Sequence, residues 1–424
     1  MRTPKFLITL TTLLAVLTAC GGEGGSGAGD VKVPDDPAQV KGDITYAIWD
    51  VNQQPAMQEV VKAFNQTYPG VKVSISLATF DQYFTKLKTQ ASSDNLPDVF
   101  WMNGPNFQLF AANKQLAPVA NLADAKNYPQ ALNDLYSLDG TQFGVPKDFD
   151  TIALWYNKKL FADAGVAAPT AEWTWDDYKS TAAKLKTALG PKGIFATGDE
   201  LGNQGNWYPA ILSNGGHIIK DGKSGFGDAK TVEALQFWSD MVKQGYTPSA
   251  AQGADIRGRD RFFAGKAAMM WNGNWLVSAA LKSPVKDDLA ILPLPKAPSG
   301  DRKTVIHGIG NVMSAKTKSP EAAAAFLSFL GGKEAALIQA KAGAANPAYN
   351  GTQTDFVKSA PYALQTFIDA AAQYSEPYPV SKDTAVWNKL ETDLILPALG
   401  GDKPMSEVGA EVAAKMDEAL GKEK

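Results

Sequence analysis

Two hydrophobic patterns, one typical of strands and one of helices, follow each other in the first quarter of the chain. Asp43–Trp49 is an apolar, β-favouring run, and the next apolar residues fall on one helical face that ends at Pro69-Gly70. Val71–Leu77 alternates as a second strand, a second helix follows, and residues 98–102 form a third apolar run. The order strand, helix, strand, helix, strand predicts a parallel sheet and an α/β fold class.

Polar and aromatic residues stand at the carboxyl ends of these three predicted strands, where open α/β sheets bind ligands. They are Trp49, Asp50, Asn52 and Gln53 after the first strand, Phe80 and Asp81 after the second, and Trp101 and Asn103 after the third. An aromatic ring can stack on the C–H face of a sugar, while amides and carboxylates can bind its hydroxyl groups. The combination therefore predicts a carbohydrate site.

The later pattern predicts two segments that cross between lobes. Residues 147–156 run from polar residues into a β-favouring stretch, and residues 305–311 alternate glycine with β-formers. The polar candidates on these segments are Asp148 and Asp150 on the first, and His307 and Asn311 on the second. We expect hinges near Asp150 and His307.

A further strand at residues 267–271 ends in a second group of small polar residues and tryptophan. Asn274 and Trp275 are the candidates there. By contrast, Trp238 belongs to one apolar stripe of a helix at residues 229–244, which predicts a core position.

Local signals fix other elements. Asp139-Gly140 predicts a tight hairpin turn, and Thr174 with Asp177 predicts a capping box that starts a helix. Residues 319–330 and 333–342 are alanine-rich and helical in pattern.

Composition narrows the class of function. A chain of 424 residues that is 45% hydrophobic can bury more core than one typical domain needs, which favours two lobes. A net charge of −3 without any basic run argues against nucleic acid as a partner. Two His and one Cys leave almost nothing for a transition-metal site, and we expect no metal or other cofactor.

The N-terminus predicts export and a lipid anchor. Basic residues precede an apolar run at residues 6–17, which is too short to span a bilayer and suits a signal peptide at residues 1–19. Leu17–Cys20 resembles the lipobox of bacterial lipoproteins, and Cys20 is the single cysteine. The alternative is an ordinary secretory peptide that ends near a cysteine. Residues 20–40 are rich in Gly, Ser, Asp and Pro and predict a lipidated flexible tether.

Six short motifs, in this order and behind a lipobox, resemble the family 1 extracellular solute-binding proteins of ABC-type sugar importers, the maltose-binding-protein-like group. The resemblance runs from Gly42 to about Ala419. The motifs are Trp49-Asp50, Phe64-Asn65 with Tyr68–Val73, Leu96–Val99, Tyr156–Lys158, Gly265–Met269 and Gly273–Trp275.

The resemblance implies a two-lobed, periplasmic-binding-protein-like fold, in which two βα sandwiches are joined by hinge strands around a cleft. We expect an N-terminal lobe of residues 41–149 plus 303–350 and a C-terminal lobe of residues 150–302 plus 351–424. The implied function is a monomeric, membrane-anchored receptor on the extracytoplasmic face. It would capture a mono- or oligosaccharide and deliver it to the permease of an ABC transporter.

The resemblance carries three site residues most directly: Trp101, Asp150 and Trp275. Trp207 and Trp387 stand where other family members place cleft aromatics, although a core position is equally compatible. The loop after Trp49 lacks the acidic and basic pair of maltose-binding protein, so the identity of the sugar stays open.

Alternatives remain at this point. Asp148 and Asp150, two apart on an extended segment, would point to the same face and could serve a glycoside hydrolase as an acid and base pair. A non-sugar solute is a third possibility. Asp50, Asn103 and Asn311 could simply cap helices or turns, and His307 could be a base or a satisfied loop residue. We expect a binding protein and not an enzyme.

Overall fold

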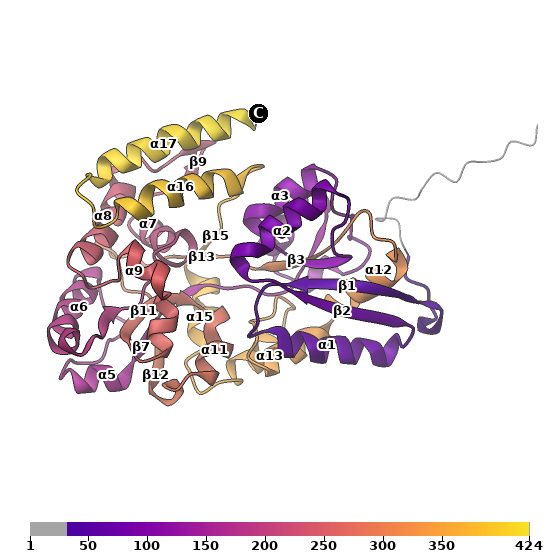
Figure 1. Cartoon of the computed structure of the whole chain (residues 1–424), viewed down its shortest axis with the longest axis horizontal. Coiled ribbons are helices and arrows are strands. Elements are labelled where there is room, and N and C mark those ends of the chain that lie inside the picture. Colours follow the sequence, from indigo (N-terminus) through magenta and orange to yellow (C-terminus); the bar gives the residue numbers. More distant parts are fainter. Residues whose placement is uncertain (1–31, 424) are drawn as a thin grey trace, which may run out of the picture.

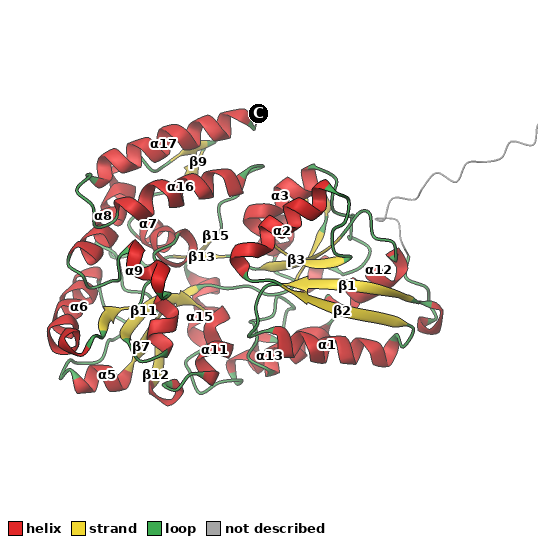
Figure 2. Cartoon of the chain, in the orientation of Figure 1, coloured by secondary structure: helices red, strands yellow, loops and turns green. Residues whose placement is uncertain are grey.

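The computed structural model describes residues 32–423, which form two α/β lobes side by side (Figures 1 and 2). We call the part around a five-stranded sheet the N-terminal lobe and the part around a four-stranded sheet the C-terminal lobe. The predicted two-lobed fold is confirmed. The predicted signal peptide, Cys20 and most of the predicted tether lie outside the described residues.

The sheet of the N-terminal lobe has the order β2-β1-β3-β14-β6. Its strands are β1 (Gly42–Ile48), β2 (Val71–Leu77), β3 (Val99–Asn103), β14 (Ile309–Met313) and β6 (Gly144–Pro146). β1 runs parallel to β2 and β3, which confirms the predicted parallel unit. β14 is antiparallel to both β3 and β6, so a late segment of the chain completes the sheet.

Six helices contribute to the core of this lobe. They are α1 (Gln54–Thr67), α2 (Phe80–Ser92), α3 (Gly104–Ala112), α4 (Gln130–Leu135), α12 (Pro320–Leu330) and α13 (Lys333–Lys341). α1 buries Met57, Val60 and Phe64, the apolar face that the sequence pattern gives it. The Phe64 ring meets Phe326 of α12 edge to face at 5.0 Å, so early and late helices share one core.

The sheet of the C-terminal lobe has the order β12-β7-β11-β8. Its strands are β12 (Leu289–Leu292), β7 (Ile152–Asn157), β11 (Ala267–Gly273) and β8 (Phe195–Thr197). Residues of β7 alternate between two core clusters, with Leu154 in one and Trp155 in the other. The sheet is therefore buried on both faces.

Eleven helices surround that sheet. They are α5 (Lys158–Asp163), α6 (Trp175–Leu189), α7 (Tyr208–Ser213), α8 (Ala229–Lys243), α9 (Ala250–Asp255), α10 (Gly258–Phe263), α11 (Val277–Lys282), α14 (Gln353–Val357), α15 (Gln365–Gln373), α16 (Thr384–Ala398) and α17 (Met405–Lys422). The Thr174 capping box at the start of α6 is confirmed, and Trp238 of α8 is fully buried as predicted.

Three chain segments connect the two lobes. The backbone of Asp150 pairs with that of His307, and Asp148 pairs with Pro347, so the crossings lie beside one another. The predicted boundary at residue 303 needs a correction, because β13 (Thr304–Ile306) pairs with β15 (Ser375–Pro377) and Val305 is buried in the core of the C-terminal lobe.

The predicted tether is also too long at its C-terminal end. Pro37–Gln39 forms a short 3-10 turn, because the Asp36 carboxylate accepts a hydrogen bond from the Ala38 amide. Val40 is fully buried in the core of the N-terminal lobe. Apolar burial therefore fixes the chain before residue 40.

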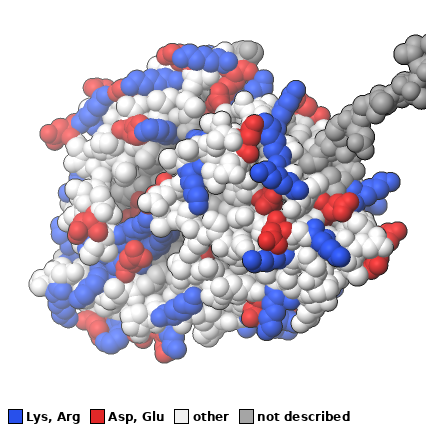
Figure 3. All heavy atoms as spheres, turned by 45° about the vertical axis from the view of Figure 1, so that its right-hand side comes forward, with Lys and Arg blue, Asp and Glu red and all other residues white. Residues whose placement is uncertain are grey.

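Two features are absent from residues 32–423. No helix in this range is long and apolar enough to cross a membrane. The same residues contain no group of three or more His, Cys, Asp or Glu side chains arranged to hold a metal ion. On the visible face, Lys and Arg alternate with Asp and Glu without a one-sign patch (Figure 3).

Candidate functional site

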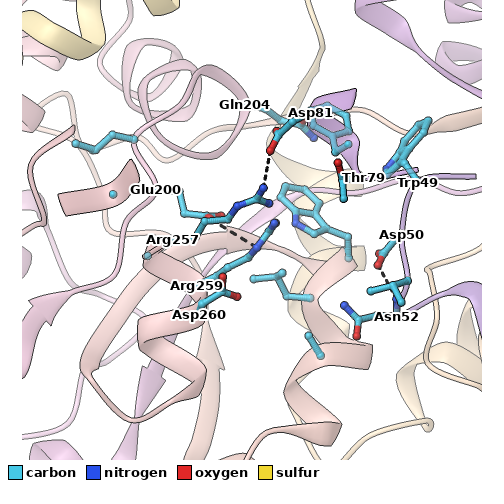
Figure 4. Close-up of a pocket in the computed structure, with 18 of the residues that line it drawn as sticks. Trp49, Asp50, Asn52, Thr79, Asp81, Glu200, Gln204, Arg257, Arg259 and Asp260 are labelled. Carbon is cyan, nitrogen blue, oxygen red and sulfur yellow. Dashed lines mark hydrogen bonds and ion pairs between the residues drawn. The ribbon is translucent and has the colours of Figure 1, made fainter. Parts of the chain in front are cut away.

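A cavity of about 890 Å³ lies between the two lobes (Figure 4). The loop after β1, residues 77–81 and the end of β3 at Asn103 line it from the N-terminal lobe. Residues 199–204, 248–260 and 275–279 line it from the C-terminal lobe. A volume near the top of the usual range for ligand sites accommodates several sugar rings.

The loop after β1 is held by its own side chains. The Asp50 carboxylate accepts hydrogen bonds from the Asn52 amide at 2.8 Å and from Gln53 Nε2 at 3.1 Å. Gln53 Oε1 in turn accepts one from the buried Lys147 Nζ at 2.9 Å. Trp49 packs edge-on against Trp101 at 5.1 Å. These contacts preorganise the Trp49 ring and the backbone of Asn52 at the cavity wall.

The start of α2, which follows β2, brings an aromatic ring and a charge to the mouth of the cavity. Phe80 is 50% exposed, although it lines the cavity. Asp81, the next residue, pairs with Arg257 Nη2 of the opposite lobe at 2.6 Å. This ion pair spans the cleft (Figure 4). Asn103 lies deeper, where its side chain also caps α3 by accepting from the Asn106 amide.

The crossing segments place Asp150 and His307 at the base of the cavity. Gln204 Nε2 donates to Asp150 Oδ1 at 2.5 Å, and His307 Nδ1 lies 3.9 Å from Asp150 Oδ2. Burial, reinforced by the Asp148 charge, raises the pKa of Asp150 well above its usual value. Burial lowers the pKa of His307 to about 4, so the imidazole is neutral near pH 7. Because the Gly104 amide donates to Nε2, the proton is on Nδ1.

Asp199 holds the loop that follows β8. Its carboxylate is buried and accepts hydrogen bonds from the Trp271 amide at 2.7 Å, Tyr178 Oη at 2.8 Å and Asn206 Nδ2 at 3.3 Å. Burial outweighs these hydrogen bonds and raises the pKa of Asp199 to about 6. The anchored loop continues into a π-helical turn, Asn203–Trp207, which carries Gln204 toward Asp150.

The start of α10 adds two arginines. Arg259 Nε lies 3.6 Å from Glu200 Oε1, and Arg257 reaches Asp81. The two loops can meet because Gly198 and Gly258 touch through their backbones. A Cβ on Gly258 would lie 2.1 Å from the Gly198 carbonyl oxygen. Further along the chain, Trp275 follows β11 and lines the same wall, half-buried.

The structure brings nine of the predicted ligand-binding residues to the cavity wall. They are Trp49, Asp50, Asn52, Gln53, Asp81, Asn103, Asp150, Trp275 and His307. Six predicted residues do not line it: Trp101, Asp148, Trp207, Asn274, Asn311 and Trp387.

The three predicted tryptophans outside the cavity wall are core residues. Trp101 is fully buried beneath Trp49, and its Nε1 donates to the Tyr46 hydroxyl at 2.6 Å. Its expected stacking on a ligand is therefore corrected to a core role. Trp207 and Trp387 are also fully buried, in the core of the C-terminal lobe.

The three polar residues outside the wall form hydrogen bonds within the protein. Asp148 accepts from the Ile309 amide at 2.8 Å and pairs with Lys147 Nζ at 2.6 Å. Asn274 accepts from the Thr151 amide, and Asn311 accepts from the Tyr46 hydroxyl. Of the predicted pair Asp148 and Asp150, only Asp150 lines the cavity.

Sequence reasoning missed most of the polar wall of the C-terminal lobe. The missed residues include Asp199, Glu200, Gln204, Arg257, Arg259 and Asp260. One usable signal was present: the short apolar run at residues 194–197 ends in Gly-Asp-Glu, a polar strand end like those of the N-terminal lobe. Arg257 and Arg259 do not follow a strand of this kind, so the same signal does not predict them.

Two α/β lobes, three crossing segments and a cavity lined from both sides define a two-lobed solute-binding protein. The sequence model of the bacterial extracellular solute-binding protein family matches residues 49–337. The chain belongs to this family, which confirms the resemblance.

Similar proteins come from several bacteria. The arabinooligosaccharide-binding protein of Bacillus subtilis (strain 168) is 26% identical over 348 residues, which cover 78% of this chain and 76% of that protein. A maltooligosaccharide ABC transporter solute-binding lipoprotein of Streptococcus pneumoniae is 23% identical, covering 99% of this chain and 97% of that protein. The solved ABC substrate-binding protein of Listeria monocytogenes in complex with cycloalternan is 26% identical. It matches with a TM-score of 0.83 over 90% of this chain and 99% of that one.

Proposed function

We propose that this protein is a monomeric, membrane-anchored extracellular solute-binding protein that captures an oligosaccharide between its lobes and delivers it to an ABC transporter permease. The main observation is the interlobe cavity, which Trp49 and Phe80 line from one lobe and Trp275 lines from the other. Aromatic rings on both walls, with amides and carboxylates between them, suit a chain of sugar rings. The related arabinooligosaccharide- and maltooligosaccharide-binding proteins support this class of ligand.

Closure of the lobes is the step that couples binding to delivery. A ligand can shift an open-to-closed equilibrium only if it binds the closed form more tightly, as a ligand that contacts both walls does. The crossings near Asp150 and His307 are the hinge in this proposal. Asp150 adds a hydrogen-bonding group at the base of the cavity, where its carboxyl already meets Gln204.

The glycoside hydrolase alternative fits the site less well. It requires two carboxyl groups that flank one glycosidic bond. Asp148 is instead engaged by Lys147 and by the Ile309 amide, away from the cavity wall. The wall therefore lacks the proposed pair, and we assign Asp150 to binding.

A thermal-shift screen followed by titration calorimetry tests the function. The panel consists of maltotriose, cellotriose, arabinotriose and galactotriose, with their monosaccharides as controls. At least one trisaccharide is expected to raise the melting temperature and bind one to one, and mass spectrometry should recover it unchanged after long incubation. Folded protein that binds none of them, or that releases reducing ends, would contradict the proposal.

The lipid anchor has its own test at Cys20, which lies outside the described residues. Expressed with its full N-terminus in a bacterial host, Cys20→Ala is expected to leave the membrane fraction, since acyl chains contribute about 0.8 kcal/mol per buried CH₂ to anchoring. Unchanged membrane association of this variant would exclude lipidation at this residue.

A further inference from the structure

We propose that Asp81 and Glu200 mask the two arginines of the cavity and thereby make the site select uncharged oligosaccharides over uronate-containing ones. This inference rests on the proposed function and deepens it, because it assigns the charge class of the sugar and the residues that set it.

The first mask is the ion pair across the cleft. Asp81 Oδ2 lies 2.6 Å from Arg257 Nη2, and the two residues come from opposite lobes (Figure 4). Both side chains line the cavity, yet 43% of Arg257 and 68% of Asp81 stay exposed. A guanidinium placed at a sugar site would be the natural partner of a uronate carboxylate. Here Asp81 already occupies it.

The second mask lies on the wall of the C-terminal lobe. Arg259 Nε is 3.6 Å from Glu200 Oε1, and Glu200 Oε2 also accepts from Asn272 Nδ2 at 3.3 Å. Among the described residues that line the cavity, these two arginines are the only lysine or arginine side chains. His307 adds no charge near neutral pH, because burial lowers its pKa to about 4.

The remaining acidic residues make the cavity unfavourable for an anion. Asp50, Asp150, Asp199 and Asp260 line it together with the two masking carboxylates. A uronate would lose hydration on entry and meet surplus negative charge without a free cation, which is costly.

The same residues do not form a site built for an ammonium group. Asp50 accepts from Asn52 and Gln53, and Asp150 accepts from Gln204. Asp199 is buried under three hydrogen bonds from neutral donors. Neutral donors of the protein thus already engage these carboxyl groups, so they are less available to an ammonium group than free carboxylates would be.

The test compares three charge forms of one sugar. The tightest-binding trisaccharide of the panel is used as such, with its primary hydroxyls oxidised to uronate, and with one hydroxyl replaced by an amine. Calorimetry on the wild type is expected to rank the neutral form first. The readout is the ratio of the affinity for the uronate form to the affinity for the neutral form. A change in lobe closure alters both affinities by the same factor and therefore leaves this ratio unchanged.

In Asp81→Asn, Arg257 loses its carboxylate, and this ratio is expected to rise about tenfold, the lower range for a charge-assisted hydrogen bond. Asp81→Asn combined with Arg257→Gln should remove the gain. Asp163→Asn, which breaks an equally short surface pair with Lys159 outside the cavity, is the matched control and should leave the ratio unchanged.

The outcomes are separable. A wild type that prefers the uronate or the amino sugar, or an unchanged ratio in Asp81→Asn, would overturn the inference while the proposed function stands. Failure of every sugar form to bind the folded wild type would contradict the proposed function itself.

Discussion

The two walls of the cavity are built in different ways. In the N-terminal lobe, Asp50 lies in the loop after β1, and Asp81 lies at the start of α2, a few residues after the parallel strand β2 ends. In the C-terminal lobe, Glu200 follows the three-residue strand β8, and Arg257 and Arg259 stand at the start of α10. One wall is a strand-end site, and the other depends on buried anchors such as Asp199. The difference predicts that the two walls respond differently to substitution.

Trp101→Ala is expected to have the largest effect, and on stability. Removing this fully buried ring should lower the free energy of unfolding by about 3–5 kcal/mol, measured by urea denaturation. The milder Trp101→Phe should retain most of the stability and nearly all of the sugar affinity. Wild-type stability with lost affinity in Trp101→Ala would instead place this ring in the binding site.

Trp275→Ala is the counterpart on the other wall. Its ring is half-buried and lines the cavity, so truncation should weaken sugar binding roughly thirtyfold or more, as for a central aromatic hot spot that contributes about 2 kcal/mol. Calorimetry measures this directly. Trp173→Ala, at a half-buried ring of the same lobe outside the cavity, should keep the affinity. Equal losses in both variants would remove Trp275 from the site.

Gly258→Ala tests the backbone contact that positions the arginines. The added Cβ would fall 2.1 Å from the Gly198 carbonyl oxygen, and relief of this overlap should cost about 1–3 kcal/mol of stability and displace Arg259. Gly253→Ala serves as control, since open space surrounds that position in α9. A Gly258→Ala protein with unchanged melting temperature would show that the contact is not tight.

His307→Gln tests the base of the cavity through pH. The pKa of His307 is about 4 in the folded protein and roughly 6.5 in an unfolded chain, so the unfolded state binds more protons between these values. The wild type should therefore lose stability as pH falls through this window, on the order of 1 kcal/mol per pH unit.

The variant should lack this component, while its Gln side chain can still accept from the Gly104 amide. The raised pKa of Asp150 has the opposite sign, since it favours the folded state at low pH, but it is present in both proteins. The measured quantity is therefore the difference between the stabilities of wild type and variant at each pH. Parallel stability curves for the two proteins would contradict the buried, neutral imidazole.

The sequence predicts the N-terminal lobe well because hydrophobic periods there match the elements. The hairpin at Asp139-Gly140 is also confirmed, with Ser137–Leu138 pairing to Thr141–Gln142 and both turn residues at positive φ. The conformation of such a turn depends on the residues within it, so the local sequence is enough to predict it.

The role of Trp101 cannot be predicted from the hydrophobic pattern of its strand. All five residues of β3 are buried, so alternation along the strand does not tell which side chains face the cavity. The sequence pattern does not predict the polar wall of the C-terminal lobe for another reason. Arg257 meets Asp81, 176 positions away in sequence, and only the tertiary arrangement of the lobes brings them together.

A crystal structure grown with the tightest-binding trisaccharide would show whether the sugar binds between the lobes. We expect the intact sugar in the interlobe cavity, in contact with Trp49 from one lobe and Trp275 from the other, and with the Asp81–Arg257 pair retained. Sugar bound outside this cavity, contact with one lobe alone, or a cleaved product near Asp150 would contradict this expectation.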